Sequence, residues 1–220
     1  MSVDIAQNLG EIKSEIGAKA TLVAVSKTKP ESDITQAYNA GHRIFGENKI
    51  QEMTDKHENL PKDIEWHMIG HVQSNKVKYM APFVKLVHAV HKMKLLKEIN
   101  KRAKENERVI DCLLQVKIAE EDTKYGMNAD EIEALLKDER LENFKNVRIK
   151  GLMGMATFTD DKEQLKREFS SLQKLYHKLE KQEPGFDTLS MGMSGDYKVA
   201  LEHDSNMIRV GSSIFGERNY

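Results

Sequence analysis

TLVAVSKTKPESDITQAYNAG, residues 21–41, contains one complete strand–helix unit. Its first part, residues 21–27, is rich in small and β-branched residues, which predicts a buried strand. Pro30 stands at the first turn of the following helical pattern and Gly41 stands at its end, so both helix signals are present. The strand ends on Lys27, and a lysine in this place is either the solvated end of a strand or a group that the strand presents.

The same alternation of strand and helix continues along the chain. Apolar residues at helical spacing predict further helices over residues 4–16 and 160–182. Eight strand–helix units in 220 residues favour an α/β fold, a (β/α)8 TIM barrel with an additional N-terminal helix, over the competing doubly wound open sheet. We expect a single domain over residues 1–220. The expected strands are residues 21–27, 43–47, 65–70, 86–90, 109–118, 149–156, 188–193 and 207–211.

The composition excludes several classes of protein. The 34 basic and 35 acidic residues nearly cancel and form no basic stripe, so we expect no nucleic-acid or membrane-surface partner. No apolar run reaches the ~20 residues of a membrane span, and the N-terminus lacks the pattern of a signal peptide. Cys112 is the one cysteine, and its apolar surroundings predict a small buried side chain. We therefore expect a cytoplasmic protein, and we expect a monomer.

In a TIM barrel the active site lies at the carboxyl ends of the strands. The residues expected there are mostly polar, small or glycine. They are Lys27, Asn48, His71, the stretch 120–126, Thr157, Ser194 and the stretch 211–213.

Lys27 has the setting that a nucleophilic lysine needs. The alternation of a strand places Thr21, Val23, Val25 and Lys27 on one side. A lysine amine attacks an aldehyde only when it is deprotonated, which requires partial desolvation or nearby cations, and the mouth of a barrel provides the former. Lys29 lies beyond the strand and is expected to be an ordinary surface lysine.

Glycine and serine residues follow the last two strands. Gly211 and Ser212 come directly after one, and Ser194 comes after the other. Backbone N–H groups at such turns bind phosphate oxygens, and the loops after strands 7 and 8 of barrels are a recurrent phosphate site. Arg209 lies two residues before Gly211 and hence on the same strand face. Its partner is the phosphate, a carboxylate, or a heteroaromatic nitrogen of the ligand.

The histidines do not form a convincing metal site. His67 and His71 are four residues apart, which is ~13 Å along a strand and too far for joint coordination. His88 and His91 have no cluster of carboxylates near them in the sequence. We predict that no metal is bound.

A reactive lysine, a phosphate site and an arginine together describe a site for pyridoxal 5′-phosphate (PLP). The chain also resembles the pyridoxal phosphate homeostasis proteins, whose barrel is similar to the N-terminal barrel of alanine racemase. The matching stretches run in the family's order from residue 24 to residue 218. They are AVSKTKP, FGENKIQE, WHMIGHVQSNK, GLMGMA, LSMGMSGDYKVAL and IRVGSSIFGER.

The resemblance implies a role for each matching residue. Lys27 holds PLP as an internal aldimine, Asn48 lies near the ring, and Arg209 faces the pyridine nitrogen. Ser194, Gly211 and Ser212 hold the phosphate. The loops 71–76 and 123–127 match family loops at the mouth without an assigned role, and Gly195 stands where many relatives carry Asp or Glu.

The resemblance implies a protein of PLP homeostasis that is not an enzyme and whose partners are PLP and PLP-dependent apoenzymes. The alternative is a PLP-dependent amino-acid racemase, which needs a second acid/base on the other face of the cofactor. Alanine racemase takes that group from a further domain, and this chain ends just after the barrel, so Tyr125, Tyr197 and Tyr220 are the substitutes to consider. A third hypothesis is a cofactor-free aldolase in which Lys27 attacks a sugar phosphate.

Overall fold

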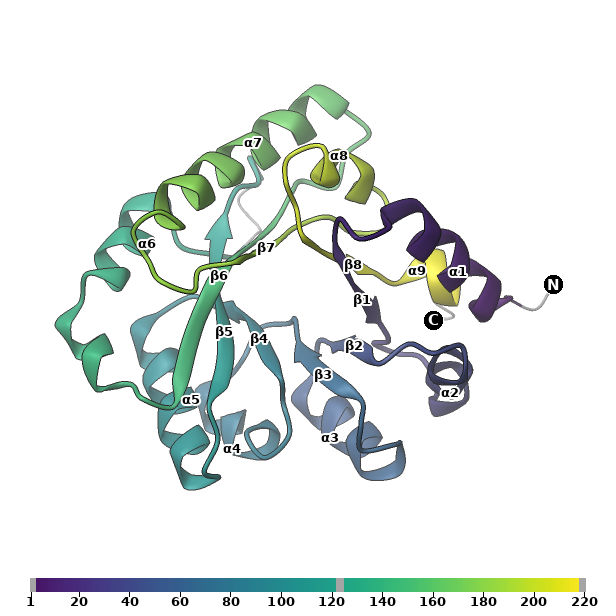
Figure 1. Ribbon diagram of the computed structural model, residues 1–220, viewed down its shortest axis with the longest axis horizontal. Coiled ribbons are helices and arrows are strands. Elements are labelled where there is room, and N and C mark those ends of the chain that lie inside the picture. Colours follow the sequence, from purple (N-terminus) through teal and green to yellow (C-terminus); the bar gives the residue numbers. More distant parts are fainter. Residues whose placement is uncertain (1–2, 122–124, 218–220) are drawn as a thin grey trace.

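Eight parallel strands close into a barrel in the order of the chain, β1 to β8 (Figure 1). The computed structural model describes residues 3–121 and 125–217. Strand β1 pairs with β2 on one side and with β8 on the other, so the sheet has no open edge. The prediction of a (β/α)8 barrel is therefore confirmed, and the doubly wound open sheet is excluded.

The strands agree with the predicted ranges to within a few residues. The largest difference is at β7, which ends at Ser190 because Gly192 has a φ of +95° and leaves the extended conformation. The strands are β1 Thr21–Val25, β2 Ile44–Glu47, β3 Glu65–Met68, β4 Leu86–Val90, β5 Ile110–Lys117, β6 Val147–Met155, β7 Thr188–Ser190 and β8 Met207–Val210.

Helices surround the barrel (Figure 1). In the described residues, none of them is both long and apolar enough to cross a membrane. The α-helices are α1 Ile5–Ile16, α2 Glu31–Asn39, α3 Ile50–Asn59, α4 Val77–Met80, α5 Met93–Glu105, α6 Ala129–Leu136, α7 Lys162–Leu179, α8 Tyr197–Leu201 and α9 Ser212–Phe215, and the 3-10 helices are η1 Ser74–Lys76 and η2 Glu139–Asn143.

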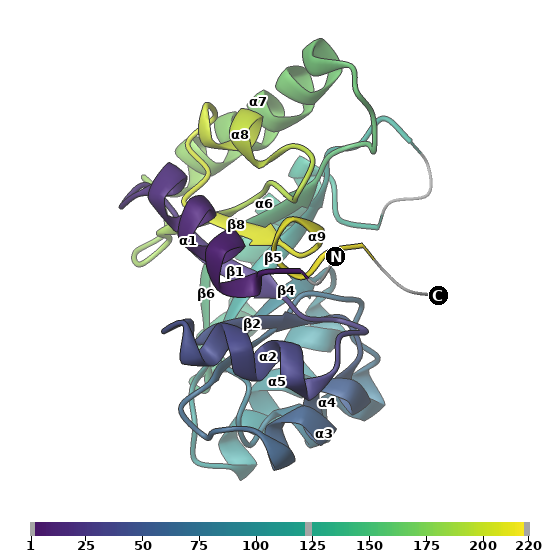
Figure 2. The ribbon, with the colours of Figure 1, turned by 90° about the vertical axis from the view of Figure 1, so that its right-hand side faces the viewer.

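The additional N-terminal helix is α1, as predicted. Asp4 caps it, since the Asp4 side chain accepts a hydrogen bond from the Gln7 backbone N–H at 2.9 Å. Helix α1 lies beside α9 in both ribbon views (Figures 1 and 2), and Asn8 Nδ2 donates to the Ile214 carbonyl at 3.0 Å. The two ends of the described chain therefore meet on one side of the barrel.

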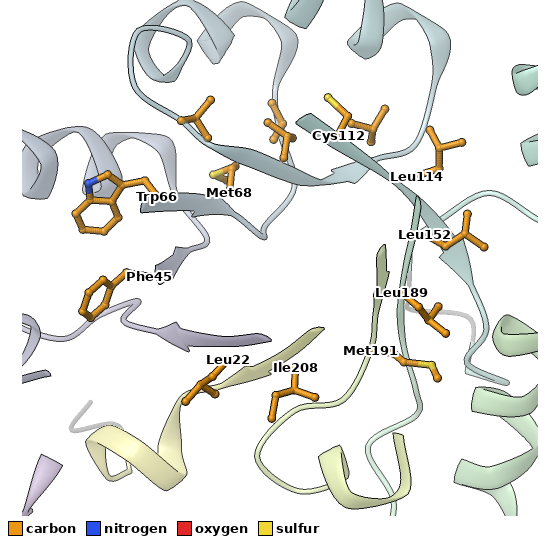
Figure 3. Packing of buried hydrophobic residues seen from close by; sticks show 14 of the residues in the cluster. Leu22, Phe45, Trp66, Met68, Cys112, Leu114, Leu152, Leu189, Met191 and Ile208 are labelled. Carbon is orange, nitrogen blue, oxygen red and sulfur yellow. The ribbon is translucent and has the colours of Figure 1, made fainter. Parts of the chain in front are cut away.

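Each strand of the barrel has an outer and an inner face. The outer side chains, Phe45, Trp66, Leu114 and Ile208 among them, pack in a large buried cluster with the helices (Figure 3). Cys112 belongs to this cluster and is fully buried, as predicted. The inner apolar side chains form a separate small cluster of Val23, Leu86, Ala89, Leu113, Met153 and Met207.

Candidate functional site

A cavity of about 760 Å³ opens at the carboxyl ends of the strands, within the usual size of small-molecule sites. Its wall includes most of the residues that the sequence analysis placed at the barrel mouth, but Glu120, Glu121 and Gly126 do not line it. Within the stretches 120–126 and 123–127, residues 122–124 lie outside the described part of the chain, and Tyr125 is in the wall. The predicted residues that line the cavity are Lys27, Asn48, His71, Tyr125, Thr157, Ser194, Gly211, Ser212 and Ser213.

Lys27 lines the cavity from the turn that follows β1, since the strand ends at Val25 and not at Lys27 as predicted. Val23 belongs to the inner cluster, Val25 lines the cavity, and Lys27 follows them on the same side. Leu22 and Ala24 face the outer cluster. The side chain of Lys27 is half-buried, so the barrel mouth desolvates it in part.

Ser194 and the loop after β8 meet at one point of the wall. The Gly211 N–H donates to Ser194 Oγ at 3.1 Å, and the Ser213 N–H approaches the same oxygen at 3.5 Å. A Cβ atom at Gly211 would lie 3.2 Å from the Val25 carbonyl oxygen, so glycine allows the loop to pass close to β1. Backbone donors and a hydroxyl thus converge beside the cavity, a pattern that suits a phosphate.

Asn48 is held in the wall by the next loop. A Cβ atom at Gly70 would lie 2.3 Å from the Asn48 carbonyl oxygen, so only glycine lets the loop after β3 pack on the Asn48 backbone. This contact fixes the backbone of Asn48, which lines the cavity.

Arg209 is buried and lines the cavity, and the described residues to which it donates hydrogen bonds offer a hydroxyl and a carbonyl oxygen, not a carboxylate. Its Nη1 donates to Ser190 Oγ at 2.5 Å and its Nη2 donates to the Gly154 carbonyl at 2.9 Å. Burial lowers the pKa of the guanidinium to about 10, while the carboxylate of Asp196 acts in the opposite direction. At neutral pH Arg209 is therefore a cation whose described partners are neutral oxygens.

A series of hydrogen-bonded, buried side chains extends from Arg209 into the barrel, and the sequence analysis did not predict it. His88 Nδ1 lies 3.1 Å from Ser190 Oγ, and His88 Nε2 lies 3.1 Å from His67 Nδ1. Arginine only donates hydrogen bonds, so Ser190 accepts from Arg209 and has its own O–H to donate to His88. We assign the proton of His88 to Nε2, from which it donates to His67, and the proton of His67 to its own Nε2.

The histidine pairing therefore differs from the one considered in the sequence. His67 pairs with His88 across neighbouring strands, while His71 and His91 have ring centroids 4.9 Å apart at the mouth. Burial lowers the pKa of His67 to about 3 and keeps the pKa of His88 well below its ordinary value. In the part of the chain that the structure describes, no group of three or more His, Cys, Asp or Glu side chains is arranged to hold a metal.

Lys29 is not the ordinary surface lysine that the sequence analysis expected. Its Nζ donates to three carbonyl oxygens, those of Phe215 at 2.8 Å, Gly216 at 3.1 Å and Glu217 at 2.9 Å. These carbonyls lie at the carboxyl end of α9, where a cation is favourable. Lys29 therefore ties the turn after β1 to the helix that follows the glycine–serine loop.

Comparison with known proteins places this site in a family. The family model described as alanine racemase, N-terminal domain, matches residues 3–219. A pyridoxal phosphate homeostasis protein from Aquifex aeolicus is 38% identical over 203 residues, which cover 91% of this chain and 88% of the relative.

Solved structures agree with this match. PipY of Synechococcus elongatus, solved with PLP bound, has a TM-score of 0.87 and 32% identity, and the match covers 96% of this chain and 100% of that one. An alanine racemase from Bartonella henselae has a TM-score of 0.73 with 14% identity, and the match covers all of this chain and 62% of that one. The racemase likeness shows the shared fold alone.

Substitution of Lys29 by methionine tests the contact between the turn after β1 and the carboxyl end of α9. The three carbonyl oxygens lose a charged donor, so we expect the free energy of unfolding to fall by about 1–3 kcal/mol. Urea denaturation measures it. Lys19→Met is the matched control, since Lys19 is exposed and precedes β1, and equal stability of the two variants would contradict the structural role of Lys29.

Burial of His67 predicts a loss of stability in acid. The folded ring takes up a proton only near pH 3, whereas the unfolded ring does so near its ordinary pKa of 6.5. Between these values the unfolded state binds more protons, so stability falls as the pH falls. We expect His67→Gln to reduce the slope of unfolding free energy against pH by up to about 1.4 kcal/mol per pH unit. Equal slopes below pH 6.5 would contradict a neutral buried ring.

Proposed function

The chain belongs to the family of the alanine racemase N-terminal domain and, within it, to the pyridoxal phosphate homeostasis proteins, and from this premise we propose that it binds PLP in the cavity around Lys27. The observation that carries the proposal is that Lys27, Arg209 and the Ser194–Gly211 contact all line one cavity. When bound, PLP supplies an aldehyde carbon that forms a C=N bond with a lysine amine as its oxygen leaves as water, and a pyridine ring that withdraws electrons when its nitrogen is protonated.

Each end of the cavity suits one part of this ligand. Ser194, Gly211 and Ser212 would hold the phosphate, because the backbone N–H groups and hydroxyls there are donors and glycine allows close approach. Lys27 would supply the amine, and Asn48 would lie near the ring. Lys27 and the Ser194–Gly211 contact are brought together by the pairing of β1 with β8.

Arg209 would determine what the protein does with the cofactor. Its guanidinium donates hydrogen bonds and accepts none, and Ser190 and Gly154 fix its orientation. A pyridine nitrogen that faces Arg209 must accept a hydrogen bond and hence stay unprotonated. The ring then withdraws electrons weakly, so the site favours holding PLP over carbanion chemistry on an amino acid. This supports a role in PLP homeostasis without catalytic turnover.

The alternative, a racemase-like enzyme, rests on Tyr125. Of the three tyrosines considered, Tyr125 lines the cavity and is 70% exposed. Tyr197 donates to Glu15 Oε2 at 2.8 Å and is not in the cavity wall, so it does not serve as the second acid/base. Tyr220 lies outside the described residues.

The remaining expectations of the sequence analysis stand as proposals. We propose that residues 1–220 form one domain, which the continuous buried cluster from α1 to α9 supports. We also propose a monomer in the cytoplasm, and the free, buried Cys112 supports the location because thiols stay reduced there. PLP-dependent apoenzymes are the protein partners that we propose.

Spectroscopy of the protein saturated with PLP tests the binding proposal. We expect a visible absorbance band that borohydride removes, with the ligand then attached to Lys27 in mass spectrometry. Lys27→Ala should lose both, because Lys29, the other described lysine of the cavity lining, places its Nζ on three carbonyl oxygens. Lys49→Ala is the control, since Lys49 is exposed and follows Asn48 without lining the cavity. A colourless protein that borohydride couples to a sugar phosphate would favour the aldolase hypothesis instead.

Solvent exchange of amino-acid α-protons tests the racemase alternative. With PLP-loaded protein in deuterium oxide, we expect exchange at the background rate for each of the twenty amino acids, because an unprotonated pyridine ring stabilises a carbanion poorly. Nuclear magnetic resonance measures the loss of the α-proton signal. Exchange above background that Tyr125→Phe abolishes would support the enzyme and contradict the homeostasis role without turnover.

A further inference from the structure

Lys27 is displayed on a tight turn with an unusual backbone conformation. The Lys29 N–H donates to the Ser26 carbonyl at 3.0 Å and closes the turn 26–29. Thr28 has a φ of +63°, in the left-handed region that β-branched residues rarely adopt. A residue in such a region is strained and persists only where its surroundings hold it. Contacts from other elements must therefore hold the backbone of Thr28 in this conformation.

Lys56 reaches this turn from helix α3. The side chain of Lys56 is 7% exposed, and its Nζ lies 2.8 Å from the Ser26 carbonyl oxygen. The same Nζ lies 2.7 Å from Glu47 Oε1 and 2.7 Å from Glu52 Oε1. A lysine ammonium has three N–H donors, so all three are used by these oxygens.

The two carboxylates extend the contact to both sides of Lys27. Glu47 Oε1 accepts the Ser26 hydroxyl at 2.6 Å, and Glu52 Oε1 accepts the Thr28 N–H at 2.6 Å. The residue before Lys27 is thus held through its carbonyl and hydroxyl, and the residue after it through its N–H. The bond from Glu52 falls on Thr28, whose backbone is the strained one.

We propose that Lys56, together with Glu52, is a positioning residue that holds the turn 26–29 so that the amine of Lys27 meets the aldehyde of PLP. This rests on the proposed function. The side chain of lysine is long and flexible, and a bond-forming step needs the reacting atoms about 3–3.5 Å apart and aligned. The contacts that hold Ser26 and Thr28 fix the backbone on both sides of Lys27, so that only the side chain of Lys27 remains free to move.

The competing interpretation is that Lys56 neutralises two carboxylates and stabilises the fold alone. The two interpretations differ in what they predict for ligands with and without an aldehyde. Pyridoxine 5′-phosphate has the ring and phosphate of PLP but an alcohol in place of the aldehyde, so Lys27 cannot bond to it. A positioning role affects PLP and leaves pyridoxine 5′-phosphate unaffected, whereas a loss of fold weakens both.

The test compares the dissociation constants of these two ligands in Lys56→Met and Glu52→Ala. Lys56→Met removes the three donors, and it leaves two carboxylates without their cation, so it carries a risk of misfolding. Glu52→Ala removes the acceptor of the Thr28 N–H and leaves the Lys56–Glu47 pair in place, and the Glu52 side chain is already 23% exposed. This second variant keeps the fold and decides the question if the first does not.

Lys62→Met is the matched control. Lys62 Nζ donates to the carbonyls of His57 and Glu58 at the far end of α3, so the control removes an ammonium that also binds this helix but does not reach the turn. We expect it to leave the affinity for both ligands unchanged.

We expect the affinity for PLP to fall about tenfold or more in both variants, with slower formation of the visible absorbance band. The affinity for pyridoxine 5′-phosphate should stay that of the unaltered protein. An equal fall for both ligands, or no fall for either, would overturn the proposal. If the unaltered protein forms no borohydride-sensitive bond between PLP and Lys27, the proposed function fails first and this inference fails with it.

Discussion

The pairing of β1 with β8 is the constraint on which the rest of the structure depends. Register pairs from Thr21↔Met207 to Ala24↔Val210 join the first strand to the last, so no strand edge is left with unpaired backbone groups. The same pairing brings Gly211 against Val25, although they lie near opposite ends of the sequence. Lys27 and the glycine–serine loop become one site only because the sheet closes.

Among the described residues, the buried cation Arg209 donates hydrogen bonds to neutral oxygens, while the carboxylate of Asp196 acts on it through the electrostatic field. A buried charge is costly unless it is hydrogen-bonded, and Arg209 finds its partners in Ser190 and the Gly154 carbonyl. His88 and His67 continue the chain as neutral rings. A carboxylate in direct contact would neutralise Arg209, whereas these neutral oxygens orient the guanidinium and leave its positive charge in place.

The sequence was sufficient for the barrel and for the residues at its mouth, because strand alternation and strand ends are local properties. It was not sufficient for contacts that depend on where elements meet. Strand alternation places the side chains of His67, His88 and Ser190 inside the barrel. Which of them lie at the same level along the barrel axis depends on the pairing register of the strands, which the sequence does not give. The role of Lys56 was detectable in the sequence. It lies three residues after Met53, on the face of α3 that is buried, and a buried lysine needs a partner.

Three lysines near the mouth have different tasks, and the geometry separates them. Lys29 and Lys56 each place their three N–H donors on three oxygens, so each acts as an ammonium that joins elements and has no lone pair for an aldehyde. Both bind the turn 26–29 or extend from it, and this turn carries Lys27. The hydrogen bonds of Lys29 and Lys56 thus fix the backbone turn that carries Lys27. Lys27 and Lys29 both line the cavity, but the Nζ of Lys29 is held by three carbonyl oxygens.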